Sequence, residues 1–411
     1  MYMDNAKRKN MSLILVTVFL FTILFVLAVS SNMRNTQMPR IKETYGISLT
    51  EVGFFTATMS IGMLLSSFVS GIIGDRFKKK TILAILFPIY IGLLFIIGAT
   101  PSFLILTLGF LLIGMLTSMM ILIGNTFVAE LFPAKKAMGL NLLHMVWAIG
   151  SVVSPMYVTF TYNKGYHWSG DYTFWALASI AVAALFYVVL YVTKFDAGRS
   201  EKVGRDGEKS KGGYLALLKE RYLLYICLFA FIQMAFQNLL MLWMPLYFDD
   251  LGYAANVMGD LVTLLWVGMT IGRLLYSLFS ARIDMILYLK TVSIVGPCAM
   301  FVCLFINAYW LWLVMLPIFG VLISAIYPLS VAITCELYPD RATSANAVTG
   351  ITGSIGAVIM SALIGFVADN FGFTVAMAIP AVMYLTVFFI LSVAKFPIPK
   401  PVRKPKPKPA T

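Results

Sequence analysis

Residues 130–133 read Glu-Leu-Phe-Pro, and residues 336–339 read Glu-Leu-Tyr-Pro, nearly the same tetrapeptide 206 positions further along the chain. The same offset brings other residues into register without an insertion. These matches are Met38-Pro39 with Met244-Pro245, Gly46 with Gly252, Gly62-Met63 with Gly268-Met269, Gly114 with Gly320, and Ile149-Gly150 with Ile355-Gly356. Each match is weak by itself, but their shared register indicates a chain built from two copies of one architecture.

The composition predicts that both copies lie in a membrane. The chain has 411 residues, of which 60% are hydrophobic and 12% are charged, whereas soluble domains carry about 25% charged residues. A membrane-spanning helix needs about 20 apolar residues. Twelve runs are long enough, at 12–37, 49–74, 81–99, 103–131, 139–162, 172–194, 221–248, 254–281, 285–306, 308–338, 343–367 and 373–396. We therefore predict an all-α integral membrane protein with 12 transmembrane helices in two pseudo-symmetric six-helix bundles.

The repeat and the apolar runs divide the chain into four parts. The N-terminal six-helix bundle covers 1–194 and the C-terminal six-helix bundle covers 221–396, with a basic linker at 195–220. The tail at 397–411 alternates Lys and Pro, so we expect it to be extended and solvated. Two repeated halves in a membrane chain are typical of transporters that bind their solute between the halves.

The net charge of +13 has a topological explanation. Basic residues gather at the N-terminus, in the turn at 76–80, in the linker and in the tail, while the opposite loops hold only Arg40, Lys42 and Lys164. Cytoplasmic loops carry such an excess of Lys and Arg. The pattern predicts a multi-pass protein of the cytoplasmic membrane with both termini in the cytoplasm, and it argues against nucleic acid as a partner.

Enzymatic and metal-dependent functions find no support in the sequence. The four cysteines lie inside apolar runs without CxxC or Cys/His spacing, at Cys227, Cys298, Cys303 and Cys335, and they are interpreted as small buried hydrophobic residues. No phosphate-binding loop and no nucleophile motif is present. We expect a monomeric protein that is not an enzyme, has no cofactor and binds a small molecule within the lipid bilayer.

The turn after the second apolar run reads Gly-Ile-Ile-Gly-Asp-Arg-Phe-Lys-Lys-Lys at residues 71–80. It resembles the loop signature G-x-x-x-D-R-x-G-R-K of the major facilitator superfamily, with Lys78 in place of a glycine. The resemblance implies a carrier in which Gly71, Asp75 and Arg76 form a latch between the two halves. A carboxylate at a helix end can face the N-terminus of another helix. We add Glu130 and Glu336, which occupy the repeated tetrapeptide, to this gating group.

Three further segments resemble the sugar-permease branch that includes the fucose–proton symporters and related glucose transporters. They are Asn141 to His144 in span five, Trp243-Met244-Pro245 in span seven and Ile326-Tyr327-Pro328 in span ten. The resemblance implies a sugar as substrate. Related permeases often carry a carboxylate six residues before the tryptophan of span seven, where this chain has Gln237. The coupling ion is therefore left open.

Span seven also provides the main candidates for binding a neutral solute. Gln233 and Gln237 are four residues apart and share a helix face, and Asn238 follows them. Amides both donate and accept hydrogen bonds, which suits the recognition of hydroxyl groups. Further candidates are Asn125 and four aromatic residues that could stack on a sugar ring, Trp147, Trp243, Trp266 and Tyr327.

Embedded cations support a different hypothesis. Arg273 lies about two turns inside span eight, Arg34 lies near the outer end of span one, and His144 lies in span five. Charges at such depths are costly and usually functional. Three functions stay open: a secondary carrier for a sugar or similar solute working by alternating access, a carrier for organic anions that uses Arg273 and Arg34, and a membrane receptor that does not transport.

Overall fold

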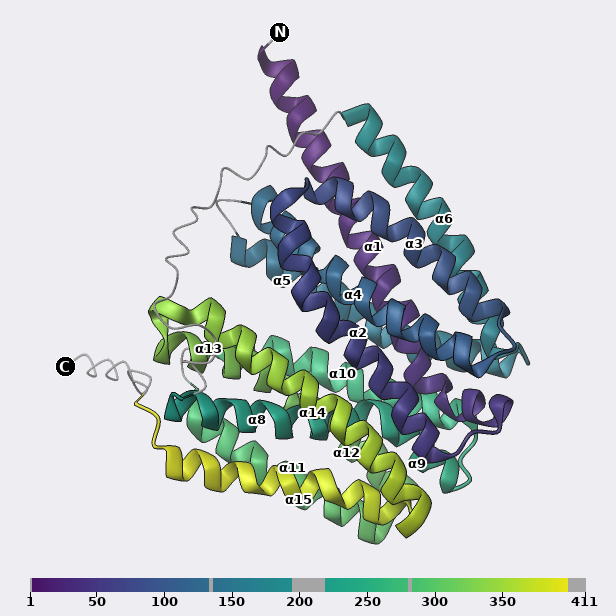
Figure 1. The fold of residues 1–411 in the computed structure, drawn as a ribbon, viewed down its shortest axis with the longest axis vertical. Helices are drawn as coiled ribbons and strands as arrows, with labels where there is room; N and C mark the ends of the chain where they lie inside the picture. The colour runs from purple at the N-terminus through teal and green to yellow at the C-terminus, as the bar shows by residue number, and fades with distance from the viewer. Residues whose placement is uncertain (1, 133–135, 194–218, 280–282, 398–411) are drawn as a thin grey trace, which may run out of the picture.

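A computed structural model describes residues 2–132, 136–193, 219–279 and 283–397 (Figure 1). The helices of the first half are α1 (Tyr2–Tyr45), α2 (Leu49–Arg76), α3 (Lys79–Ala99), α4 (Phe103–Leu131), α5 (Lys136–Asn163) and α6 (Trp168–Thr193). Those of the second half are α8 (Arg221–Asn238), η2 (Leu239–Trp243), α9 (Met244–Asp250), α10 (Ala255–Phe279), α11 (Met285–Ile306), α12 (Tyr309–Ile323), α13 (Ile326–Leu337), η4 (Pro339–Arg341), α14 (Ala342–Phe371) and α15 (Phe373–Ala394). Most of the predicted linker and tail lies outside the described residues.

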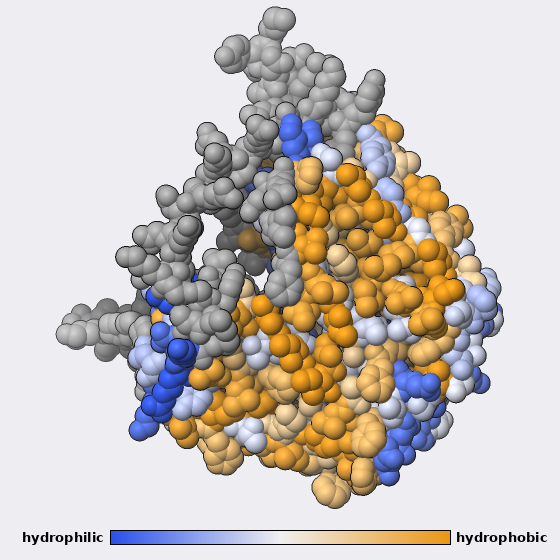
Figure 2. All heavy atoms as spheres, in the orientation of Figure 1, coloured by the Kyte–Doolittle hydropathy of each residue, from blue (hydrophilic) through white to orange (hydrophobic). Residues whose placement is uncertain are grey.

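The described residues contain twelve spans long and apolar enough to cross a membrane, which confirms the prediction from the sequence. Apolar side chains cover a broad part of the face seen in Figure 2, with polar residues toward its edges. Several large apolar side chains of the protein are strongly exposed, for example Phe305 at 87% and Leu278 at 75%. Exposure of this extent requires lipid as the surrounding solvent, because contiguous apolar surface in water promotes association.

Two of the twelve spans are interrupted, whereas the sequence predicted one continuous helix for each. Span seven changes from α8 to the π-helical segment η2 just before Met244-Pro245, and span ten breaks between α12 and α13 just before Tyr327-Pro328. Proline has no backbone N–H and its ring clashes with the preceding turn, which weakens the helix there. Proline alone does not decide the break, since Pro39 lies inside the continuous helix α1. Interrupted helices in transporters often lie beside the substrate site.

The helix pairs within the two halves correspond through the repeat. In the first half α1 packs on α5, α2 on α4 and α3 on α6, and in the second half α8 packs on α14, α10 on α12 and α11 on α15. The largest contacts between the halves join α2 to α14 and α5 to α10. The 206-residue shift relates these two pairs to each other, so the halves meet through a pseudo-symmetric interface.

Repeated glycines allow the close approach of helices within each half. A Cβ atom on Gly62 would overlap the carbonyl oxygen of Leu111, and a Cβ atom on Gly268 would overlap that of Pro317. Gly114 in α4 is equally crowded, because a Cβ atom there would overlap the carbonyl oxygen of Met59. Small residues at such crossings let helix backbones pack closely in lipid, where the hydrophobic effect does not hold helices together.

We predict that Gly62→Ala lowers the stability of the purified protein by about 1–3 kcal/mol, because the added methyl group forces α2 and α4 apart. Thermal unfolding in detergent measures this change. Gly92→Ala in α3 is the matched control, since a Cβ atom at Gly92 has no neighbouring atom within 4 Å. Equal melting temperatures for the two variants would contradict the packing role assigned to Gly62.

Candidate functional site

The two halves touch closely at one end of the molecule, which we name the closed end. A Cβ atom on Gly53 in α2 would lie 2.6 Å from the carbonyl oxygen of Ser361 in α14. The repeat-related Gly259 in α10 is similarly crowded by Thr159 in α5. In Figure 1 the two groups of helices converge where α9 and the beginning of α2 lie, and they spread apart toward the chain termini. We name this second end the open end.

A pocket lies in the second half, where the interrupted span ten faces span seven and α14. Its walls come from α8, α13 and α14, and its polar lining consists of Gln233, Tyr327, Ser330, Asn346 and Thr349. The Tyr327 side chain is 54% exposed and follows the helix break directly. This pocket combines apolar walls with a few polar groups, as small-molecule sites usually do.

The two glutamines of span seven form a ladder along one face of α8. The Nε2 atom of Gln233 donates to Oε1 of Gln237 at 3.3 Å, and Nε2 of Gln237 donates to the sulfur of Met241 at 3.7 Å. Gln233 is buried, while Gln237 and Asn238 are half-buried. Thioether sulfur is a weak acceptor, so a solute hydroxyl can replace it as the partner of Gln237 with little loss.

His144 and Arg273 come from different halves, on the helices α5 and α10 that pack against each other. The His144 side chain is exposed on α5 and the Arg273 side chain is half-buried on α10. Among the described residues, Arg273 has no hydrogen bond and no ion pair. Arg273 is thus a half-buried cation on a helix at the interface between the halves, without a counter-charge in the described part of the chain.

The remaining substrate-binding candidates lie away from the pocket lining. Trp243 is fully buried and packs edge-on against Phe373, with ring centroids 6.2 Å apart. Trp147 and Asn125 are half-buried in α5 and α4. Arg34 is buried inside the first half, with its guanidinium carbon 5.7 Å from the centroid of the Phe110 ring.

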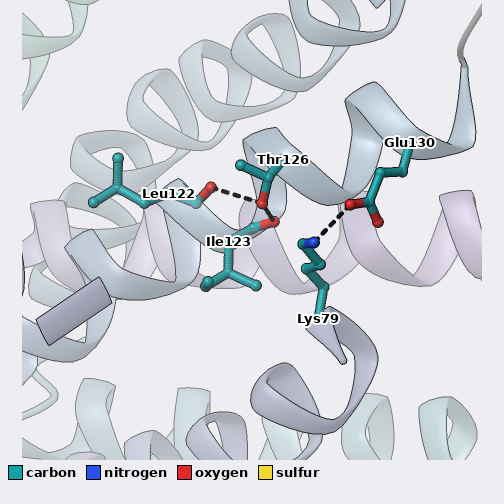
Figure 3. Close-up of polar contacts among 5 residues, drawn as sticks. All are labelled: Lys79, Leu122, Ile123, Thr126 and Glu130. Carbon is teal, nitrogen blue, oxygen red and sulfur yellow. Dashed lines mark hydrogen bonds and ion pairs between the residues drawn. The ribbon is translucent and has the colours of Figure 1, made fainter. Parts of the chain in front are cut away.

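Glu130 makes its contact inside the first half. Its carboxylate pairs with the ammonium group of Lys79 at 2.6 Å, which joins the end of α4 to the beginning of α3 (Figure 3). Glu336, the repeated counterpart, is exposed. Gly71, Asp75 and Arg76 lie at the end of α2, and their latch stays a prediction.

The structure adds a residue that the sequence did not single out for gating. At the closed end the Asp369 carboxylate of α14 accepts hydrogen bonds from the backbone N–H groups of Leu49 at 3.0 Å and Thr50 at 2.6 Å, and from Oγ1 of Thr50 at 2.5 Å. The first N–H groups of a helix have no partner within the helix. Ser48 caps the N–H of Glu51, so Asp369 completes the cap of α2 from the other half.

The repeat contains a signal that could have indicated Asp369 as a functional residue. The 206-residue shift aligns this carboxylate with Asn163, so the charge is present in one copy of the repeat only. Among the described residues, no group of His, Cys, Asp or Glu is arranged to hold a metal ion. The polar groups of the pocket lining are amides and hydroxyl groups.

Several solved transporters share this fold. The crystal structure of a D-xylose–proton symporter matches with a TM-score of 0.75 at 14% identity, over 94% of this chain and 98% of the other. The crystal structure of a point mutant of the nucleoside transporter NupG matches with a TM-score of 0.76 at 14% identity, over 92% of this chain and 99% of the other.

Sequence relatives lead to the same grouping. An uncharacterized MFS-type transporter of Bacillus subtilis strain 168, YfkL, is 20% identical over 352 residues, 82% of this chain and 85% of the relative. A TsgA homologue of Citrobacter koseri is 20% identical over 369 residues, 87% of this chain and 89% of the relative. The sequence matches the profile of the Major Facilitator Superfamily over residues 20–322 and 249–411. With its twelve spans in two related halves, the chain belongs to the Major Facilitator Superfamily.

Proposed function

We propose that this protein is a secondary active transporter that moves a sugar or a similar hydroxylated solute across the cytoplasmic membrane by alternating access. The observation that carries this proposal is the pocket beside the Gln233–Gln237 ladder. Amides bind neutral hydroxyl groups without the cost of burying a charge. The fold shared with solved sugar and nucleoside transporters supports a small polar solute.

The positive-inside pattern orients this site. With both termini in the cytoplasm, the open end faces the cytoplasm and the closed end faces outward. The structure then represents an inward-open state. Opening to the outside requires the contacts at Gly53, Gly259 and Asp369 to separate, and the turn at 71–80 to close the cytoplasmic end.

An organic anion is the second candidate substrate, because Arg273 lies between the halves without an ion-pair partner among the described residues. A receptor that binds without transport is the third. Exchange of labelled solute across proteoliposome membranes separates a carrier from a receptor, since only a carrier returns its site to both sides. We favour the carrier because the two halves contact each other through packed helices at the closed end and diverge toward the other.

We predict that Gln237→Met, which keeps the length of the side chain, weakens solute counterflow by up to about tenfold through the loss of a hydrogen bond, worth about 0.5–1.5 kcal/mol. Counterflow of labelled sugars into proteoliposomes is the measurement. Asn163→Ala removes an exposed amide at the closed end and serves as the control. Unchanged uptake in the Gln237 variant would remove the glutamine ladder from the binding site.

We predict that Asp369→Asn shifts the protein toward an outward-open state. The variant keeps the side-chain volume but removes the charge from the N-terminus of α2, a loss of about 1–2 kcal/mol. Spin labels on Lys164→Cys and Phe305→Cys, in a background without native cysteines, report the distance between the two halves at the outer end by pulsed electron resonance.

The longer-distance population should grow in the Asp369 variant. Asp250→Asn removes an exposed carboxylate at the same end and should leave the distances unchanged. Identical distance distributions in the parent protein and the Asp369 variant would show that this cap does not hold the closed end together.

A further inference from the structure

We propose that the transported solute is a polyhydroxylated oxyanion, a sugar acid or a sugar phosphate, whose anionic group is bound between Arg273 of the second half and His144 of the first. This inference rests on the proposed transport function and names its substrate class. The hydroxyl groups are bound by the Gln233–Gln237 ladder. The negative charge supplies the counter-ion that the described part of the protein does not provide.

Arg273 needs such a counter-ion. It lies in the last third of the 25-residue helix α10, inside a membrane span. Isolated charges inside a membrane cost several kcal/mol unless they are paired. Lys79 differs from Arg273 in this respect, because its ammonium group pairs with the carboxylate of Glu130 at the end of a helix.

Two carboxylates that lie within the fold, those of Asp171 and Asp369, are engaged elsewhere. The Asp171 carboxylate is buried in the first half, where it accepts from Nε2 of Gln37 at 2.5 Å and Oγ1 of Thr161 at 3.1 Å. The Asp369 carboxylate caps α2 at the closed end. No carboxylate of the described residues pairs with Arg273, so we assign the opposite charge to a ligand.

The repeat places His144 on the matching wall of the other half. The residue 206 positions after His144 is Gly350, which lines the pocket of the second half. Because the halves are pseudo-symmetric, His144 occupies the equivalent depth and face in the first half. Its side chain is exposed, and an imidazole N–H can donate a hydrogen bond to an oxyanion.

The packing of α10 brings Gly272, the residue before Arg273, against span ten near its break. A Cβ atom on the preceding residue, Gly272, would overlap Oγ of Ser324 and lie 2.7 Å from Cα of Val321. Ser324 lies at the break of span ten, which the pocket-lining Tyr327 follows closely. The helix that carries Arg273 and the pocket therefore both adjoin span ten near its break, α10 at Val321 and Ser324 and the pocket at Tyr327.

The geometry also couples binding to the transport cycle. His144 and Arg273 belong to α5 and α10, which pack against each other across the interface between the halves. An anion that contacts both side chains draws the open ends of these helices together. A neutral sugar lacks this bridging contact, so the two residues select for charge and assist closure of the cytoplasmic end.

The test is ligand-induced stabilisation of the purified full-length protein in detergent, followed by counterflow in proteoliposomes. The probes are hexoses and pentoses, the corresponding uronates and aldonates, and the corresponding sugar phosphates, all at equal concentration and ionic strength. A ligand that binds the folded state raises the unfolding temperature. We expect either the sugar acids or the sugar phosphates to raise the unfolding temperature, and the corresponding neutral sugar to raise it much less. Comparison of the carboxylate and phosphate arms identifies the oxyanion.

Variants connect this result to the proposed residues. Arg273→Gln and His144→Asn should each weaken binding of the stabilising acid by about 10- to 100-fold, as expected for hydrogen bonds to a charged group. Arg273→Lys keeps the positive charge, so its affinity for the acid should fall less than that of Arg273→Gln. This difference separates a loss of anion binding from a failure to fold. Arg341→Gln removes a cation from η4, outside the site, and should bind normally.

Two failures can be told apart. If a neutral sugar stabilises the protein as well as its acid, and Arg273→Gln does not change its affinity, the anion inference is wrong while the transport function stands. If no member of the panel, neutral or acidic, stabilises the protein or exchanges in counterflow, the proposed function itself is overturned.

Discussion

The close approach of helix backbones at repeated glycines is the constraint on which the rest of this structure depends. In lipid, helices do not gain from burying apolar surface against each other, so packing and polar contacts must hold them together. Gly62 and Gly268 provide the crossings within the halves, and Gly53 and Gly259 provide those between the halves. A substitution at these glycines would place a side chain onto a neighbouring backbone atom or side chain.

The repeated glycines give the two halves similar helix packing, whereas their polar residues differ. The glutamine ladder and Arg273 belong to the second half, whereas His144 belongs to the first. At the closed end, Asp369 caps α2 across the interface, and the repeat places a neutral Asn163 at the equivalent position. An asymmetric site inside a symmetric scaffold allows one solute to be bound in one orientation while the halves move as units.

Much of the fold followed from the sequence, because span length and apolar composition are local properties. The predicted spans correspond to the twelve observed ones. The interruptions in spans seven and ten were missed, since proline inside an apolar run either kinks or breaks a helix according to its neighbours. For the site, the spacing of Gln233 and Gln237 indicated a shared face, but nothing local showed that Trp243 packs against Phe373 rather than toward the pocket.

The sequence by itself determined the membrane class, the number of spans and the duplication, because each is encoded in composition or in the 206-residue register. Tertiary structure decided which residues meet across 320 positions of chain, as Asp369 and Leu49 do. It also decided that Glu130 pairs with Lys79 within one half, and that α5, which carries His144, packs against α10, which carries Arg273. Such contacts depend on how helices tilt and cross, and a pattern along one helix does not record the side chains of another.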